Sequence, residues 1–207
     1  MPLQNRVDPF GELREVAARG LFLGNRGGRF HRDDRTLSRR RWASRAWICC
    51  RLEFKSRHRE VWGKGYTELF FLDEPTALAA GHRPCFECRR ADAMAFAAAW
   101  ARGQRLNAPP RAGEMDLVLQ PQRLAGREKR RHRANLDALP DGAMIVLDDV
   151  PFAMRGDALL PWSFSGYGAP RPRPRAVEVE LLTPPAIVAV LSAGYRPHWH
   201  PSAGGCE

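Results

Sequence analysis

Two cysteines separated by two residues, Cys85 and Cys88, place the tightest constraint on what this chain can fold into. This spacing allows both thiolates to face one cation from a single tight turn, as they do in zinc sites. A tetrahedral zinc ion takes four ligands, so one such turn supplies half of a site. The sequence therefore predicts a zinc site on Cys85 and Cys88 that is completed from elsewhere in the chain.

The remaining ligands are expected from Cys49 and Cys50, which lie in an apolar run predicted as a strand over 47–54. Neighbouring residues of a regular strand point to opposite faces of a sheet, so only one of the two would reach the metal. A histidine such as His82 or His58 would then be the fourth ligand. A bulge at the pair would bring both thiols to one face, and a buried apolar role for either is a third alternative. The candidate ligands are Cys49, Cys50, Cys85 and Cys88.

The cysteine usage and the lack of export signals indicate a cytoplasmic protein. Five unevenly spaced cysteines do not form a disulfide framework, and in a reducing compartment a C-x-x-C pair is a metal or redox site. The redox alternative is weaker because no βαβ pattern surrounds the pair. No stretch approaches the roughly 20 apolar residues that span a bilayer, and the first residues lack a signal-peptide pattern. We therefore expect no membrane contact.

The chain is strongly basic, with a net charge of +10 and a pI near 10.2. All but three of its 33 basic residues are arginine, so a bias of a GC-rich genome toward arginine is one explanation. Two clusters concentrate the charge, however, and a field of this sign favours polyanions such as nucleic acid. We expect nucleic acid, with DNA as the first choice, as the partner. The predicted contacts are Arg39, Arg40, Arg41, Lys129, Arg130, Arg131 and Arg133.

The first half of the chain, 1–106, has the pattern of a small zinc-binding α/β module. Its apolar runs are rich in β-branched and aromatic residues, which predicts strands, and an antiparallel hairpin or meander is the natural pairing of the two longer runs. Asp73 caps the helix that follows them, and Gly81 ends it. The expected elements are an amphipathic helical lead-in over 1–20, a short strand with a glycine-rich turn over 21–28, strands over 47–54 and 66–72, and helices over 74–80 and 92–102.

The second half, 114–207, is predicted as a β-rich domain after a proline- and glycine-rich linker at 107–113. Short strands separated by Asp, Gly and Pro are typical of such a unit, and a partly closed barrel is one arrangement of them. The expected fold class is therefore α+β. The expected elements are helices over 114–124 and 184–191, and strands over 143–147, 152–154, 158–162 and 177–181.

The stretch over 47–90 resembles the zinc domain of the Ada DNA-repair proteins, most closely from Glu68 to Arg89 (ELFFLDEPTALAAGHRPCFECR). In that family a strand, an alanine-rich helix and an R-P-C-x-x-C turn follow in this order. Four cysteines hold zinc there, and one of them accepts a methyl group from a DNA phosphotriester. The resemblance implies zinc on Cys85 and Cys88. Ada domains place their other cysteines in the loop after the first strand, and the matching loop here, 55–65, contains none, so the methyl-accepting role is not carried over.

These observations predict a zinc-binding protein that contacts nucleic acid, in DNA repair or regulation. Trp42, Trp47 and Trp62 are candidates for stacking on bases, with core packing as the alternative for each. Two other functions stay open. In the first, zinc only stabilises the fold of a small domain, and the C-terminal unit binds protein or RNA. In the second, a zinc-held thiolate accepts an alkyl group. No catalytic residue is assigned.

Overall fold

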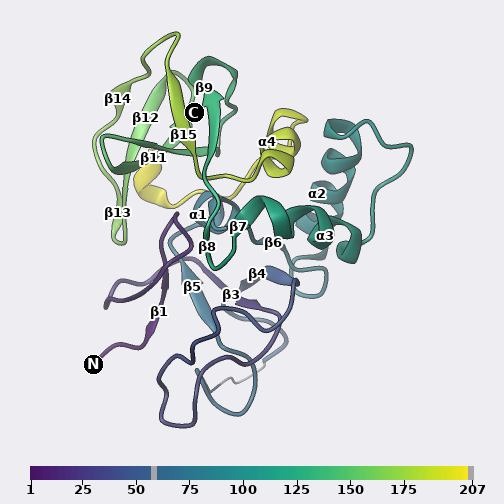
Figure 1. Ribbon diagram of the computed structural model, residues 1–207, viewed down its shortest axis with the longest axis vertical. Coiled ribbons are helices and arrows are strands. Elements are labelled where there is room, and N and C mark those ends of the chain that lie inside the picture. The colour runs from purple at the N-terminus through teal and green to yellow at the C-terminus, as the bar shows by residue number, and fades with distance from the viewer. Residues whose placement is uncertain (57–59, 205–207) are drawn as a thin grey trace.

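The computed structural model, which describes residues 1–56 and 60–204, has an α+β fold (Figure 1). Over these residues the strands form a six-stranded sheet, a seven-stranded sheet and a small two-stranded sheet. In Figure 1 the six-stranded sheet lies at the bottom, the seven-stranded sheet lies at the top, and the longer helices lie to the right. The predicted α+β class is confirmed, while the partly closed barrel stays a prediction.

The six-stranded sheet takes its strands from the first half of the chain. They are β1 (Gln4–Val7), β2 (Leu13–Glu15), β3 (Phe22–Arg26), β4 (Trp47–Arg51), β5 (Leu69–Phe71) and β6 (Arg83–Pro84), in the order β2-β1-β5-β3-β4-β6. β3 lies between β4 and β5 and pairs antiparallel with both. The prediction of a hairpin between the strands at 47–54 and 66–72 is therefore wrong, because β3 separates them.

The first 20 residues form a strand hairpin, so the predicted helical lead-in is wrong. β1 and β2 pair antiparallel with Val7 opposite Leu13, and both side chains are buried in the core of the sheet. Gly11, at a φ of 79°, turns the chain, and its amide donates to the carbonyl oxygen of Asp8 (2.8 Å). The left-handed turn that glycine allows brings the two apolar residues to the same face.

The seven-stranded sheet takes its strands from the last third of the chain. They are β9 (His132–Asn135), β10 (Met144–Leu147), β11 (Val150–Arg155), β12 (Ala158–Ser163), β13 (Gly166–Tyr167), β14 (Arg171–Pro172) and β15 (Glu178–Leu181). Their order is β13-β12-β11-β10-β15-β9, with β14 beside β12. The four strands predicted from the apolar runs of this region are all present as β10, β11, β12 and β15.

The described residues contain the α-helices α1 (Glu74–Ala79), α2 (Arg90–Gly103), α3 (Ala112–Arg123) and α4 (Pro185–Ser192), and two 3-10 turns, Leu136–Ala138 and Pro201–Ala203. A short hairpin, β7 (Leu124–Ala125) and β8 (Glu128–Lys129), follows α3. Asp73 caps α1 as predicted, since its carboxylate accepts from the amide of Thr76 at 3.1 Å. None of the helices in the described part of the chain has the length and apolar character that crossing a bilayer requires.

One apolar core joins both halves of the chain. Leu78 of α1 and Trp100 of α2 belong to the same buried cluster as Phe152 of β11. The core therefore extends across the predicted linker at 107–113, part of which lies in α3. The division of the chain into two domains stays a prediction.

Candidate metal centre

Three thiols converge at one point of the structure. The ligand atoms of Cys50, Cys85 and Cys88 all lie within 4.8 Å of one another, and all three residues are buried. A tetrahedral zinc ion with sulfur at about 2.3 Å holds its ligands about 3.8 Å apart, so the trio needs only a small adjustment to receive a metal. We refer to Cys50, Cys85 and Cys88 as the thiol trio.

The parallel pairing of β4 with β6 creates this arrangement. Cys49 of β4 lies opposite Pro84 of β6, and its carbonyl oxygen accepts a hydrogen bond from the amide of Cys85 (3.0 Å). β6 then ends, and the amide of Arg89 donates to the carbonyl oxygen of Cys85 (3.0 Å), which closes a turn just before α2. Within this turn the amide of Glu87 donates to the sulfur of Cys85 (3.4 Å). The turn thus presents the thiols of Cys85 and Cys88 to the neighbouring strand.

Cys49 and Cys50 occupy successive positions of a regularly paired strand and belong to different clusters. Cys50 packs with Cys85 and Cys88. Cys49 is fully buried in the core that contains Leu69 and Phe71. The guanidinium of Arg89 donates to the sulfur of Cys49 (3.3 Å). The structure therefore brings together Cys50, Cys85 and Cys88 of the four candidate ligands, and it leaves Cys49 apart from them.

Of the two histidines considered as ligands, His82 is not part of the trio. It is fully buried beside the rings of Trp47 (5.1 Å) and Phe71 (4.7 Å), and burial lowers its pKa well below the usual value. His58 lies outside the described residues. The described residues therefore provide three ligand atoms, and a fourth position remains for water or another group.

A pocket of about 510 Å³ adjoins the trio. Its lining includes all three sulfur-bearing residues together with polar side chains from β3 and from the segment before β5. In zinc enzymes, three protein ligands leave the fourth position to water or substrate, whereas structural sites use four protein ligands. A metal held by the trio would therefore be within reach of a small molecule that enters this pocket.

The thiols of the trio differ in their pKa values. Hydrogen bonds from Cys50 and then from Cys88 lower the pKa of Cys85 far below that of an ordinary thiol. Hydrogen bonding with Cys85 and then with Cys88, followed by burial, raises the pKa of Cys50. Cys85 is therefore the thiol of the trio that loses its proton most readily, and a metal ion would displace the protons of its thiol ligands when it binds.

A buried ionic network begins immediately after the trio. The guanidinium of Arg89 lies 2.9 Å from the carboxylate of Glu74, and both side chains are almost completely buried. A second carboxylate, from Asp92, lies 2.8 Å from the same guanidinium. Glu74 also accepts from the hydroxyl of Tyr195 (2.7 Å) and the amide of His198 (2.9 Å). The network ties the start of α2 to α1 and to the C-terminal segment.

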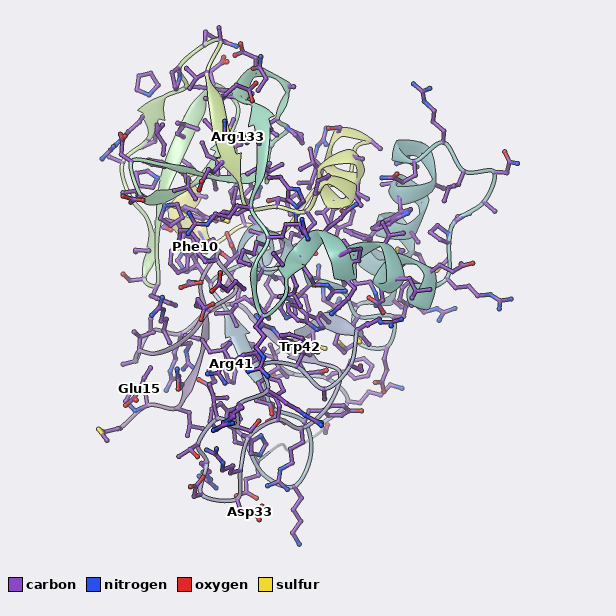
Figure 2. The ribbon with its side chains drawn as sticks, viewed as in Figure 1. Phe10, Glu15, Asp33, Arg41, Trp42 and Arg133 are labelled. Atoms are coloured by element: carbon purple, nitrogen blue, oxygen red, sulfur yellow. The ribbon has the colours of Figure 1, made fainter. Side chains whose placement is uncertain are left out.

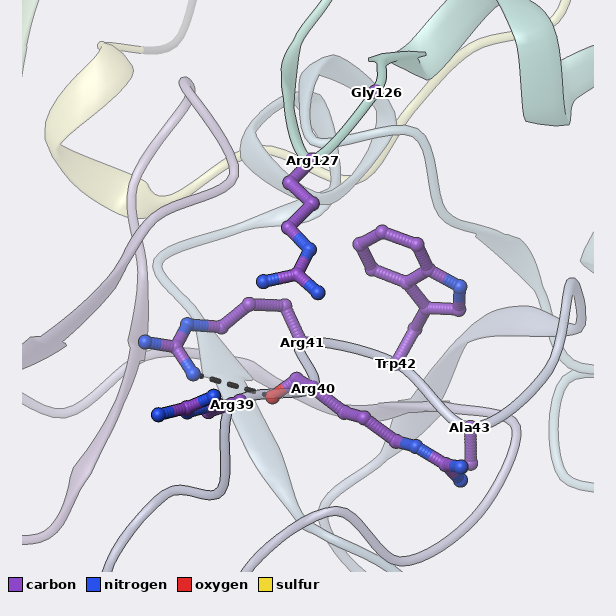
Figure 3. Close-up of a pocket in the computed structure, with 7 residues that line it drawn as sticks. All are labelled: Arg39, Arg40, Arg41, Trp42, Ala43, Gly126 and Arg127. Carbon is purple, nitrogen blue, oxygen red and sulfur yellow. Dashed lines mark hydrogen bonds between the residues drawn. The ribbon is translucent and has the colours of Figure 1, made fainter.

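Three of the predicted nucleic-acid-binding arginines lie at one pocket. Arg39 and Arg40 are exposed, and Arg41 is half-buried. The pocket has a volume of about 430 Å³ and is lined by Arg39, Arg40, Arg41, Trp42, Ala43, Gly126 and Arg127 (Figure 3). We call it the arginine pocket. Arg127, in the turn between β7 and β8, is not among the predicted contacts, although it belongs to the same basic run as Lys129.

The other predicted arginines lie away from this pocket. Arg130, Arg131 and Arg133 are exposed, and Arg131 forms an ion pair with Glu180 at 2.8 Å. Figure 2 shows Arg133 on the seven-stranded sheet, well separated from Arg41. The basic residues therefore form a pocket and a separate exposed group rather than a single stripe.

The three candidate stacking tryptophans have different environments. Trp47 and Trp62 are buried, so core packing is their role. Trp62 stacks on His31 with ring centroids 5.3 Å apart, and its indole donates to the carbonyl oxygen of Glu68 (2.9 Å). Trp42 is half-buried and lines the arginine pocket. It is the one tryptophan of the three that remains a candidate for stacking.

Lys129 differs from the other predicted basic contacts because its ammonium is turned into the protein. It donates to the carbonyl oxygen of Ala79, at the end of α1. Burial, followed by repulsion from Arg26 and Arg123, lowers the pKa of Lys129 to about 7. The ammonium of Lys129 is therefore engaged by the backbone of α1, although the residue as a whole is half-buried.

We expect Lys129 to give the protein a distinctive dependence of stability on pH. Its pKa is 10.5 in the unfolded chain and about 7 in the folded one, so between these values only the unfolded chain binds the proton. The free energy of unfolding then rises with pH. Urea unfolding of wild type and Lys129→Met at about pH 7 and pH 10 should show the wild type gaining stability relative to the variant. A stability difference that is constant over this range would contradict the assignment.

Comparison with family models, curated proteins and solved structures gives no match. The resemblance to the Ada-type zinc domain therefore stays a prediction, and function has to be argued from the sites themselves.

Proposed function

We propose that this protein binds zinc through Cys50, Cys85 and Cys88 and contacts nucleic acid through its exposed arginines. The observation that carries the first part is the convergence of three buried sulfurs within 4.8 Å. Thiolate ligands favour zinc over the hard cations magnesium and calcium, which prefer oxygen. Free thiols of this kind belong in a reducing compartment, so the proposal includes a cytoplasmic location.

Zinc at this point would cross-link two parts of the chain that the pairing of β4 with β6 brings together. Cys50 belongs to β4, whereas Cys85 and Cys88 lie in the turn between the two-residue strand β6 and α2. Binding energy at such a site becomes folding energy, because the unfolded chain has no preformed site. Metal analysis of the purified protein tests this part directly.

The second part rests on charge and exposure. The chain has a net charge of +10, and five of the seven predicted contacts, all arginines, have exposed side chains. Arginine recognises phosphate with two parallel hydrogen bonds, which suits contact with a nucleic-acid backbone. A role in DNA repair or in regulation is the setting we propose for such contact.

Salt dependence tests the contact with nucleic acid. Because each neutralised phosphate releases counterions, we expect the affinity for a labelled oligonucleotide to fall by about 100-fold or more between 50 and 200 mM salt. Fluorescence anisotropy on single- and double-stranded DNA and RNA measures this and identifies the preferred form. An affinity that is unaffected by salt would exclude phosphate contact as the source of binding.

The pocket beside the trio supports a second candidate function, transfer of an alkyl group to a zinc-bound thiolate. Zinc keeps a thiolate deprotonated at neutral pH, and the pocket of about 510 Å³ gives a donor room to approach the sulfurs. After incubation with methylated DNA, mass spectrometry of wild type would then find one added methyl group on Cys50, Cys85 or Cys88. Unmodified cysteines would rule this function out.

A further inference from the structure

The arginine pocket is formed by two segments that are far apart in the sequence. One is the stretch over 39–43, which precedes β4, and the other is the turn at Gly126 and Arg127, between β7 and β8. In Figure 3 the side chain of Arg127 extends from this turn toward Arg41 and Trp42. Its guanidinium thus faces the opposite wall of the pocket.

The charge of the pocket is not balanced by carboxylates. No acidic residue is among its seven described lining residues, which include four arginines. Arg41 donates to the carbonyl oxygens of Ser38 and Arg40. None of the four guanidiniums forms an ion pair with a residue in the described part of the chain. Such a group of unpaired guanidiniums is suited to bind an anion with charge-assisted hydrogen bonds.

A second layer of basic side chains lies directly behind the pocket. Arg26, Arg123 and Lys129 line a small adjoining cavity with one acidic residue, Glu12, and Arg41, Trp42 and Arg127 also contribute to it. Arg26 is buried, and it donates to the carbonyl oxygens of Gly11 (2.7 Å) and Arg41 (3.3 Å). Backbone carbonyl groups therefore replace the water that would solvate the Arg26 guanidinium. The positive charge of Arg26 adds to the electrostatic field in the pocket.

Arg123 has a similar environment. It is fully buried and donates to the carbonyl oxygens of Gly81 (3.2 Å) and Arg45 (3.0 Å), while its Nε atom has no hydrogen-bond partner among the residues that the structure describes. The nearest carboxylate, of Asp116, lies 4.0 Å away and is engaged by Arg83 at 2.7 Å. Burial lowers the pKa of both Arg26 and Arg123, and it outweighs the opposite effect of the carboxylates of Glu12 and Asp8 on Arg26 and of Asp116 on Arg123.

An aromatic surface completes the pocket. The ring centroid of Trp42 lies 6.1 Å from that of Trp47. The guanidiniums of Arg26 and Arg123 lie over the Trp47 ring, at 4.1 and 4.5 Å from its centroid. Trp42 is thus supported from behind and presents its indole beside the arginines. Stacking on an aromatic ring is the way in which proteins bind a nucleobase without regard to sequence.

We propose that the arginine pocket binds one nucleotide unit, with its phosphate on Arg41 and Arg127 and its base on Trp42. A volume of about 430 Å³ lies within the range of sites that hold small ligands. The inference rests on the proposed contact with nucleic acid and adds the place where a strand is held. The same chemistry would recognise a free mononucleotide, so both ligands belong in the test.

The test compares four proteins: wild type, Arg127→Gln, Trp42→Leu and the control Arg105→Gln. Arg105 is exposed, follows α2 and is neither in the pocket lining nor among the predicted contacts, so its variant matches the charge change of Arg127→Gln. The probes are a fluorescein-labelled octathymidylate, followed by anisotropy, and AMP, followed by quenching of tryptophan fluorescence. We expect Arg127→Gln and Trp42→Leu to bind the octamer at least roughly tenfold more weakly, and Arg105→Gln to change affinity by about twofold at most.

The outcomes separate the pocket from the wider proposal. Octamer binding that is equally strong in all four proteins overturns the pocket and leaves the contact with nucleic acid standing. Binding of AMP without the octamer, lost in Arg127→Gln, supports the pocket as a mononucleotide site and contradicts the contact with nucleic acid. If neither probe binds the wild type, both are wrong.

Discussion

Cys85→Ser is expected to remove zinc from the protein and most of its stability, whereas Cys49→Ser is expected to leave the zinc content unchanged. The sulfur of Cys85 is one of three within 4.8 Å, and a serine hydroxyl is a poor zinc ligand. Because the unfolded chain has no preformed site, the energy of zinc binding becomes folding energy, on the order of 10 kcal/mol in zinc-binding peptides and comparable with the whole stability of a typical domain. The variant should therefore lose its cooperative unfolding transition. Elemental analysis and thermal unfolding of the purified proteins measure both effects.

Cys49→Ser is a close control because it makes the same atomic change one residue before Cys50. Cys49 is buried against Leu69 and Phe71, and its sulfur accepts from Arg89. Its replacement should reduce stability only by the modest amount that a buried polar substitution costs, about 1–3 kcal/mol. Equal loss of zinc from Cys49→Ser and Cys85→Ser would show that the assignment of the trio is wrong.

Glu74→Gln is expected to lower the free energy of unfolding by about 3 kcal/mol or more. The substitution removes the fully buried carboxylate that balances the charge of the buried Arg89 guanidinium. The two groups are 2.9 Å apart, with side chains only 1% and 0% exposed. Asp92 remains as a partner of Arg89, but its side chain is 25% exposed and is partly screened by water. Urea unfolding of variant and wild type measures the loss.

The matched control is Glu180→Gln. Glu180 forms an ion pair with Arg131 at a similar distance, 2.8 Å, but both side chains are about half exposed. Exposed pairs contribute about 1 kcal/mol or less, so this variant should unfold almost as the wild type does. If the two variants are equally stable, the network around Arg89 does not hold α1 to α2 as we infer.

Local patterns in the sequence predicted the parts of the structure that local interactions decide. Asp73 caps α1 as expected, and the apolar runs after 140 form strands. The secondary structure predicted from sequence was wrong where pairing between separate segments determines it. The lead-in over 1–20 is compatible with helical spacing, but the pairing of Val7 with Leu13 in the sheet stabilises strands instead. Tertiary packing commonly overrides such weak local preferences.

In the candidate sites too, the sequence predicted the local features but not those that depend on tertiary packing. A regular strand allows only one of Cys49 and Cys50 to join Cys85 and Cys88, whereas a bulge would allow both, and the sequence left these alternatives open. The regular pairing of β4 and the side on which the turn before α2 lies select Cys50. The basic clusters were visible in the sequence, but the burial of Lys129 was not. Cationic side chains are rarely buried, and nothing in the local pattern marks an exception.

Measuring the zinc content of natively purified wild-type protein decides whether the thiol trio is a metal site. We expect about one zinc ion per chain, and we expect removal of the ion by a strong chelator to abolish the cooperative unfolding transition. A metal-free protein whose unfolding is the same with and without chelator would contradict this assignment.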